Sequence, residues 1–368
     1  NAGEGAVIQG LQVYPIRDVP QLVAHLREQL VLSPAVPHYQ ETESSDLLDF
    51  ADVKGQPDAK RALEIAASGG HNVLLIGPPG SGKSMLAKRL PTILPEMTFA
   101  ESLETTKIHS IRGKLPPGVS LIRSRPFRAP HHTISTAGLA GGGSSPQPGE
   151  ISLAHNGVLF LDELPEFSRA SMEVLRQPLE DKRVTISRVG GSTSYPCRFT
   201  LVAAMNPCPC GYFGHPTHPC LCSPQAVDRY LGKVSGPLLD RIDLHIEVPA
   251  VPFEELASSR QEETSQEIRQ RVNAARQRQQ ERFQGAPYTC NADIPAARLQ
   301  ELCPTTDGAL RLLQRAFDSF GFSARTYDRV LKVARTIADL DGSEQIHTSH
   351  VAEAVQYRTL DRKYWLNK

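Results

Sequence analysis

The chain has no net charge, because 40 Lys and Arg residues balance 40 Asp and Glu residues in its 368 positions. This balance excludes a uniformly basic, histone-like binder and a strongly acidic chain. Charged residues make up 22% and hydrophobic residues 40%, which is typical of a globular protein and not of a disordered one. At about 150 residues per domain, the length predicts two domains with room for an extra fragment.

The sequence also lacks long hydrophobic runs. Its apolar runs, such as 73–76 and 158–161, are far shorter than the ~20 residues that a membrane helix needs. No signal peptide is visible, so we expect a cytoplasmic protein without a membrane partner. The first residue is Asn, not Met, and we therefore expect a fragment of a longer protein.

The seven cysteines are too few, and odd in number, for a disulfide framework. Four of them lie within 15 residues, in the pattern C-x-C-x9-C-x-C: Cys208, Cys210, Cys220 and Cys222. Four thiolates at this spacing could complete a tetrahedral, structural Zn²⁺ site. The C-x-C spacing is tighter than that of the usual zinc knuckle, so free thiols on a loop rich in Gly and Pro are the alternative.

Short apolar runs indicate the secondary structure. Strand-like runs at 72–76, 157–161 and 199–204 alternate with helix-like patterns, which predicts an α/β fold with a parallel sheet. Residues 291–358 carry several helical patterns and predict a small all-helical domain. Between these regions, residues 254–283 are rich in Gln, Glu and Arg, and we expect a solvated connecting helix there.

A phosphate-binding loop is the strongest motif. Residues 77–84 (GPPGSGKS) fit G-x-x-x-x-G-K-[ST], follow an expected strand and open an expected helix. Glycines let backbone N–H groups curl around phosphate oxygens, Lys83 can reach the β- and γ-phosphates of ATP, and Ser84 can ligate Mg²⁺. A chance turn is the alternative. We expect the nucleotide to contact Pro78, Gly80, Ser81, Gly82, Lys83, Ser84 and Met85.

Two further strands end in polar residues that suit nucleotide hydrolysis. The run 158–161 is followed by Asp162, which can hold the metal, and Glu163, which can polarise the attacking water. The run 201–205 ends at Asn206, which could hold the water or the γ-phosphate. The alternatives are a helix cap for the acidic pair and a turn that begins at the asparagine before a proline.

Five blocks of sequence carry a family resemblance: residues 52–56, 77–84, 125–133, 148–157 and 205–211. With these blocks, residues 50–368 resemble AAA+ ATPases of the magnesium-chelatase-like group, and specifically its ComM (YifB) branch. The resemblance implies a P-loop AAA+ sheet flanked by helices and a C-terminal all-α lid domain. The implied organisation is a Lon-protease-like remnant (1–36), a linker (37–49), the ATPase core (50–252), a helical connector (253–288) and the lid (289–368).

The resemblance also implies roles for individual residues. AAA+ modules assemble into rings, usually hexamers, with ATP at the subunit interfaces. Arg241 would then be the arginine finger that reaches the γ-phosphate of the neighbouring subunit, unless it forms a local ion pair with Asp240 or Asp243. Arg325 would contact the γ-phosphate of its own chain. In the segment 52–56, Val53 and Gly55 would lie beside the adenine.

Two insertions are expected to line the pore of such a ring, one within 105–156 and one formed by a hairpin over 183–198. Residues 105–149 contain six Lys or Arg and no acid, and residues 182–227 contain four and no acid. A ring would multiply these charges into a channel that suits a phosphate backbone. The expected DNA contacts are Arg125, Arg128, His131 and Arg188; subunit contacts or plain solvation are the alternative.

The function that follows is an ATP-hydrolysing homo-oligomeric ring motor acting on single-stranded or branched DNA without sequence preference. It resembles the ComM motor, which promotes branch migration during natural transformation. One alternative is a magnesium- or cobalt-chelatase motor subunit that remodels a partner enzyme. Another is a component of an ATP-dependent protease, although no Ser-Lys protease site can be assigned in these residues.

Overall fold

The computed structural model describes residues 2–8, 10–37, 48–143, 146–188, 191–258 and 261–366. Most of the expected linker over 37–49 therefore lies outside the described residues. The chain divides into two compact units: residues 1–45 with 96–125, and residues 46–95 with 126–368. The expected boundaries at residues 36, 252 and 288 stay predictions. Among the described residues, no helix has both the length and the apolar character needed to cross a membrane.

In its described residues, the first unit contains the helices α1 (Ala2–Ala6), α2 (Val19–Leu26) and α5 (Phe99–Ile111). The helix α5 starts at a capping box, in which Thr98 and Glu101 each accept the other's backbone N–H. One face of α5 is buried, whereas α1 and α2 bury no side chain. Outside these helices, Val7, Leu121 and Ile122 of this unit are also buried.

The second unit is built on a five-stranded sheet whose pairings are all parallel, in the order β2-β5-β8-β1-β9. Its strands are β1 (Val73–Ile76), β2 (Phe127–Arg128), β5 (Val158–Leu161), β8 (Thr200–Met205) and β9 (Leu244–Glu247). Every residue of β1, β5 and β8 is buried. Continuous apolar strands of this kind are typical of a parallel sheet that is covered on both faces.

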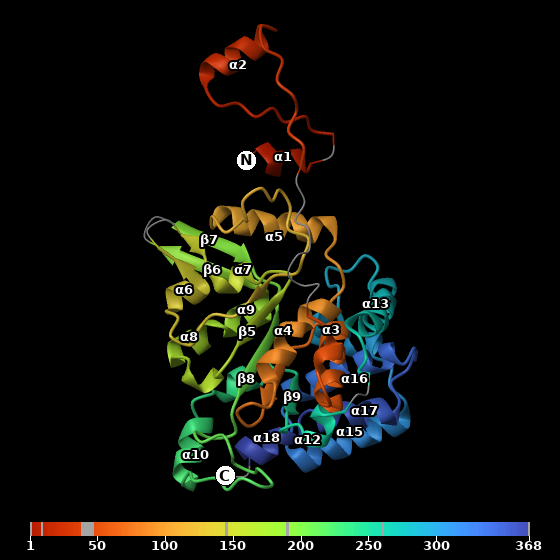
Figure 1. Cartoon of the computed structure of the whole chain (residues 1–368). Helices are drawn as coiled ribbons and strands as arrows, with labels where there is room; N and C mark the ends of the chain where they lie inside the picture. The colour runs from red at the N-terminus through yellow and green to blue at the C-terminus, as the bar shows by residue number, and fades with distance from the viewer. Residues whose placement is uncertain are drawn as a thin grey trace. The chain divides into compact units, whose positions relative to one another are not determined.

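Alternate side chains of the strands enter two separate cores. Leu75 and Phe160 pack with α3 (Pro57–Gly69) and α4 (Lys83–Ile93), whereas Leu74 and Leu161 belong to the core on the other face. Figure 1 shows α8 (Arg169–Val174), α9 (Arg176–Asp181) and α10 (Pro224–Leu231) on one side of the sheet and α3 on the other. The shorter elements of this unit are α6 (Thr136–Ala140), α7 (Glu150–Leu153), α11 (Gly236–Leu239), α12 (Phe253–Leu256), β3 (Gly141–Gly142) and β4 (Gln147–Pro148).

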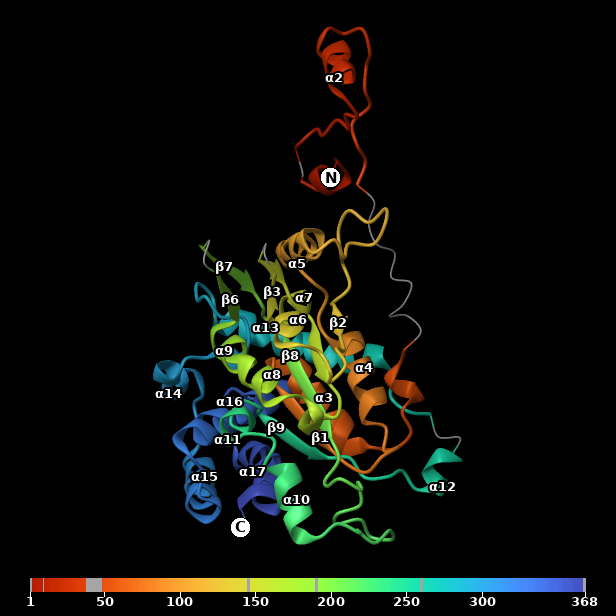
Figure 2. The ribbon, with the colours of Figure 1, turned by 90° about the vertical axis from the view of Figure 1, so that its left-hand side faces the viewer.

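The C-terminal region is mostly helical, and several of its helices gather beside the sheet (Figure 2). They are α13 (Ser265–Arg282), α14 (Leu299–Leu302), α15 (Asp307–Phe320), α16 (Ala324–Leu340), α17 (Thr348–Gln356) and α18 (Thr359–Asp361). The expected α/β fold, a P-loop parallel sheet flanked by helices and followed by a helical C-terminal region, is confirmed.

The expectation of a solvated connecting helix over 254–283 is wrong for α13. This helix buries Ser265, Ile268, Val272, Ala275 and Gln279, which recur every three or four residues and form one stripe. The stripe packs against α3, α4 and α16. Only two of these five side chains are large and apolar, which is why the pattern is weak in the sequence.

The expected hairpin is present as β6 (Arg183–Arg188) and β7 (Gly191–Pro196), paired antiparallel from Arg183↔Pro196 to Arg188↔Gly191. Residues 189 and 190, which contain part of the expected Gly-Gly turn, lie outside the described residues. Val184 and Ile186 point into the core, whereas Thr185 and Ser187 are exposed. The alternation seen in the sequence therefore fixes which face of the hairpin is buried.

Candidate functional site: the carboxyl edge of the parallel sheet

The phosphate loop connects the end of β1 to the start of α4. Gly80 and Gly82 have φ of +75° and +89°, a conformation that side chains disfavour. At Gly77, a Cβ would lie 2.1 Å from the carbonyl oxygen of Val248, so no side chain fits between the loop and the backbone after β9. The glycine positions of the motif are therefore required by the backbone itself.

Lys83 is held inside this loop. Its Nζ donates to the carbonyl oxygens of Gly77 and Pro78, both at 2.8 Å, and lies 3.3 Å from Oδ1 of Asn206. Burial lowers the pKa of Lys83 to about 8, although the nearby Asp162 carboxylate opposes this shift. The ammonium group is thus surrounded by oxygen atoms of the loop and of Asn206. A change of side-chain rotamer could bring it to a phosphate oxygen instead.

The depressed pKa of Lys83 predicts that ATP binding depends on pH. Because phosphate binds the ammonium form, ATP affinity should fall as the pH rises above about 8, with a slope approaching tenfold per pH unit. Equilibrium ATP binding between pH 7.5 and 10 measures this. The Lys83→Arg variant keeps its charge throughout and should bind with no such slope. A wild-type affinity that stays constant up to pH 10 would contradict the role of this ammonium.

Ser84 and Asp162 meet at the metal position. The hydroxyl of Ser84 donates to Oδ2 of Asp162 at 2.6 Å, although the two residues are 78 positions apart. Ser84 is the second residue of α4, and Asp162 follows β5 directly. A hydroxyl and a carboxylate oxygen at one point are a donor set that suits Mg²⁺. The residues present therefore fit the expected metal.

Glu163 stands next to this position in a strained backbone conformation, with φ of +52°. Its backbone N–H donates to Asp162 Oδ1 at 2.9 Å, and its side chain is 57% exposed. The Oε2 atom lies 3.1 Å from Nδ1 of His132, whose ring also packs edge-on against the buried Phe167. His132 therefore holds the carboxylate that is expected to polarise water.

His132 is a residue whose role the sequence did not reveal. It follows β2, and β2 pairs with β5 in register Phe127↔Val158, which brings the residues after both strands together. The order of the strands was the missing information, because a two-residue edge strand leaves almost no signal in the sequence.

The carboxyl ends of β1, β5 and β8 therefore bring together the expected hydrolytic residues. Lys83, Ser84, Asp162 and Asn206 are linked by direct contacts, and Glu163 is adjacent. The carboxyl ends of parallel strands lie at the same edge of a sheet. The segments that follow β1, β5 and β8 therefore meet here although they are far apart in the sequence. The roles of these residues in hydrolysis remain proposals.

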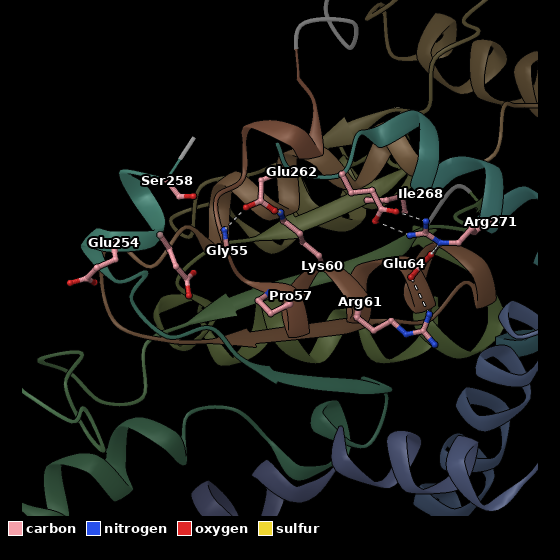
Figure 3. Close-up of a pocket in the computed structure, with 12 residues that line it drawn as sticks. Gly55, Pro57, Lys60, Arg61, Glu64, Glu254, Ser258, Glu262, Ile268 and Arg271 are labelled. Atoms are coloured by element: carbon pink, nitrogen blue, oxygen red, sulfur yellow. Dashed lines mark hydrogen bonds and ion pairs between the residues drawn. The ribbon is translucent and has the colours of Figure 1, made fainter. Parts of the chain in front are cut away.

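The adenine was expected beside Val53 and Gly55. The Val53 carbonyl accepts from Lys60, and the Gly55 N–H donates to Oε1 of Glu262 at 3.2 Å. A pocket of about 600 Å³ adjoins Gly55 and is lined by five glutamates and three cations (Figure 3). The excess of carboxylates in this pocket would repel phosphate groups. If the adenine binds in the pocket, the triphosphate must therefore extend out of it to the phosphate loop. Met85, at 38% exposure, is accessible to a ligand.

Arg241 lies at the opposite, amino edge of the sheet. Its backbone carbonyl accepts from Asn72, the residue before β1, and its side chain pairs with Glu180 at 2.5 Å. The pair involves neither Asp240 nor Asp243, the two partners considered from the sequence. Four residues of β1, about 13 Å of strand, separate this edge from the phosphate loop. Arg241 is therefore too far to serve the ATP site of its own chain.

Arg325 is also found away from the phosphate loop. It is exposed near the start of α16, one helical turn before Arg329, and Arg329 pairs with Asp243 just before β9. The helix thus places Arg325 towards the amino edge of the sheet. This placement argues against the expected contact with the γ-phosphate of the same chain, since a side chain spans only about half the length of β1.

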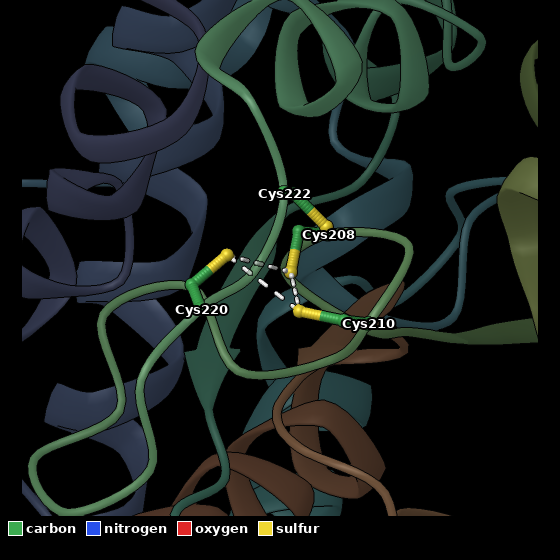
Figure 4. A group of neighbouring side chains, drawn as sticks. All are labelled: Cys208, Cys210, Cys220 and Cys222. Atoms are coloured by element: carbon green, nitrogen blue, oxygen red, sulfur yellow. Dashed lines mark hydrogen bonds between the residues drawn. The ribbon is translucent and has the colours of Figure 1, made fainter.

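The four clustered cysteines lie together on the loop between β8 and α10 (Figure 4). Their Sγ atoms are all within 4.8 Å of one another, so this group could hold a metal ion. Burial disfavours ionisation of Cys210, but backbone N–H groups of Tyr212 and Leu221 lower its pKa to about 6. One thiolate is therefore favoured even without a metal.

Two of the four expected DNA contacts are already paired within the chain. Arg128 forms a two-pronged ion pair with Glu150 at 2.6 and 2.8 Å, and Arg125 lies 3.4 Å from Glu101. His131 is exposed and bonds Thr133. The side chain of Arg188 lies outside the described residues. Acids just beyond the acid-free stretch 105–149 thus neutralise both arginines, which counting charges within the stretch did not show.

Comparison with known proteins agrees with this geometry. A family model for magnesium chelatase, subunit ChlI, matches residues 49–256, and one for the C-terminal part of that subunit matches residues 262–358. The chain is 45% identical to competence protein ComM of Haemophilus influenzae, across 98% of the chain and 71% of that protein.

Other relatives extend this similarity. Identity is 46% to the uncharacterized protein YifB of Escherichia coli, across 85% of the chain and 61% of that protein. The chain is 42% identical to the uncharacterized protein Rv2897c of Mycobacterium tuberculosis, across 97% of the chain and 71% of that protein. The chain thus spans between 61% and 71% of the length of these relatives. With two family models that together cover most of its residues, the chain belongs to the magnesium chelatase ChlI-like family of AAA+ ATPases.

Proposed function

We propose that this chain is the ATPase part of a ring-shaped motor that acts on DNA, as the resemblance to the ComM branch implies. The observation that carries the ATPase half is the meeting of Lys83, Ser84 and Asp162 at one edge of the sheet. The similarity to competence protein ComM supports the DNA half.

Hydrolysis would be an in-line displacement at the γ-phosphate by water. Lys83 would leave the loop carbonyls for the phosphate oxygens, and Glu163 would accept the proton of the attacking water. Asn206, 3.3 Å from Lys83, would orient the water or the phosphate. Mg²⁺, held by Ser84 and Asp162, would neutralise developing phosphate charge. His132 would position Glu163.

The placement of Arg241 and Arg325 supports a ring. Both lie towards the amino edge, whereas the nucleotide residues occupy the carboxyl edge of the same sheet. In a ring, head-to-tail interfaces join different surfaces of successive subunits. We therefore propose that both arginines serve the ATP of the neighbouring subunit, and that the site is incomplete in a single chain.

DNA contact is proposed for the basic insertions, with revised residues. Arg125 and Arg128 have acidic partners, but Lys107 and Lys114 are exposed and form no ion pair with any described residue. The side chain of Arg183, on the hairpin, donates to the hydroxyl of Ser194 and forms no ion pair with any residue the structure describes. These three cations are free to meet phosphates, and none of them reads base sequence.

The double variant Lys107→Ala/Lys114→Ala should weaken DNA binding and lower its salt slope by about one per lost phosphate contact. ATP binding without DNA should not change. Titration of labelled single-stranded DNA at several salt concentrations measures both the DNA affinity and its salt slope. Arg311→Ala/Arg315→Ala, which removes two exposed cations from α15, is the control. Equal losses in the two variants would refute a specific role for the insertion.

The alternative is a chelatase motor subunit that remodels a partner enzyme. The chain is also 31% identical to the magnesium-chelatase 67 kDa subunit of Chlorobaculum parvum, but across only 44% of its length. The fold is compatible with both functions, so activity must decide. DNA-stimulated ATP turnover supports the motor on DNA, whereas turnover that responds only to a partner protein supports the alternative.

A structural Zn²⁺ ion at the cysteine group completes the proposed set of bound species. It would hold a loop next to the phosphate loop and take no direct part in hydrolysis, since four protein ligands leave no open position.

A further inference from the structure

The cysteine group has the dimensions of a single metal's coordination sphere. Cys208 Sγ lies 3.4 Å from that of Cys210 and 3.7 Å from that of Cys220, and the last two are 3.6 Å apart. Four sulfurs at the usual ~2.3 Å from one tetrahedral Zn²⁺ would be about 3.8 Å apart. All seven cysteines of the chain are free thiols, so no disulfide accounts for the approach.

The loop supplies backbone donors to these sulfurs. Phe213 donates its N–H to Cys208 Sγ at 3.3 Å, and the N–H groups of Tyr212 and Leu221 are directed at Cys210. Backbone donors around the sulfurs stabilise thiolates and orient them, as the outer shell of a metal site does. Figure 4 shows the four side chains converging from two strands of the loop.

We infer that these four cysteines bind one Zn²⁺ ion, and that the ion clamps residues 206–222 onto the phosphate loop so that ATP turnover depends on it. Four cysteines also commonly bind an iron–sulfur cluster with several irons. Such a cluster is larger than a single ion, so its four cysteine sulfurs lie further apart than those observed here. His215 accepts N–H bonds from Thr217 and His218 and is not part of the sulfur group.

The clamp follows from two contacts between the metal loop and the ATP site. Cys208, which is fully buried, comes two residues after Asn206, the residue that contacts Lys83. Gly211, with φ of +86°, lies so close to Pro79 that a Cβ would be 2.4 Å from the proline Cδ. One ion would therefore fix both Asn206 and the phosphate loop. This second half of the inference rests on the proposed ATP site, whereas the metal itself does not.

Metal analysis of the whole chain, purified without added zinc, tests the first half. We expect about one zinc and no iron per chain, and a tetrahedral thiolate spectrum after exchange with Co²⁺. Cys220→Ser/Cys222→Ser should lose the metal, because two ligands are too few to hold it. Cys303→Ala, outside the group, should keep it. A folded chain without metal, or one that contains iron, would overturn the zinc assignment.

The dependence of ATP turnover on the zinc ion is tested on the wild-type chain, so that a loss of activity cannot come from a misfolded variant. Zinc is removed with a thiol reagent and a chelator, then restored after reduction, while ATP binding and turnover are followed. We expect a reversible loss of about tenfold or more in turnover, with far-UV circular dichroism unchanged. Equal turnover without zinc would refute the clamp. If the zinc-loaded chain turns over no ATP at all, the proposed function fails, and ATP affinity with and without zinc then decides the clamp.

Discussion

Replacing Glu163 with Gln should leave ATP bound but almost unhydrolysed. The amide keeps the shape of the side chain but cannot accept the proton of the attacking water, so kcat should fall roughly 10²–10⁴-fold. ATP affinity should change little, because Lys83, Ser84 and Asp162 are untouched. Single-turnover hydrolysis and equilibrium binding of ATP together measure the two quantities.

Glu166→Gln is the matched control for this prediction. Glu166 is a carboxylate three residues further on, and its partner is Lys233 on the surface. Removing it should leave turnover unchanged, since exposed ion pairs contribute little. If Glu163→Gln hydrolyses ATP at the wild-type rate, another group must accept the proton of the attacking water. The proposed roles of Glu163 and of its contact with His132 would then be refuted.

Replacing Arg241 with Ala should lower ATP turnover on the order of 10³-fold, while the isolated chain binds ATP as before. The reason is geometric: the guanidinium lies at the edge of the sheet remote from the phosphate loop of its own chain. It can stabilise transition-state charge only across a subunit interface. Turnover should be measured at concentrations above and below assembly, because only assembled chains should show the difference.

The ion pair of Arg241 with Glu180 allows a sharp control. Glu180→Gln breaks that pair but keeps the guanidinium, so turnover should survive. If Arg241 is merely structural, the two variants should fail together. Mixing Arg241→Ala with Lys83→Ala chains gives a second readout. Each variant supplies what the other lacks, so mixed rings should regain turnover, and no recovery would contradict action between subunits.

Local patterns in the sequence identified what short stretches of backbone determine. The phosphate loop was visible because glycine spacing follows from backbone conformation, and Asp162 and Asn206 because each ends a fully buried strand. The β6–β7 hairpin was visible in the alternation at Val184 and Ile186. In each case the pattern that identifies the feature lies within a few consecutive residues.

Features that depend on distant partners were not visible. His132 meets Glu163 only because β2 is next to β5, and Arg128 meets Glu150 across 22 residues. The burial of α13 depends on polar positions whose hydrogen bonds replace those to water: Ser265 accepts from the Phe50 N–H, and Gln279 donates to the Ser68 carbonyl. Arg325 was matched to a motif, but the packing of α16 decides which edge of the sheet it approaches.

ATP turnover of the wild-type chain at low salt, with no DNA and with single-stranded, duplex and four-way-junction DNA, tests the central claim most directly. We predict that turnover rises when single-stranded or branched DNA is added, that Lys83→Ala abolishes it, and that salt reverses the stimulation. Turnover that no DNA changes, in a preparation that assembles and binds ATP, would contradict a motor acting on DNA.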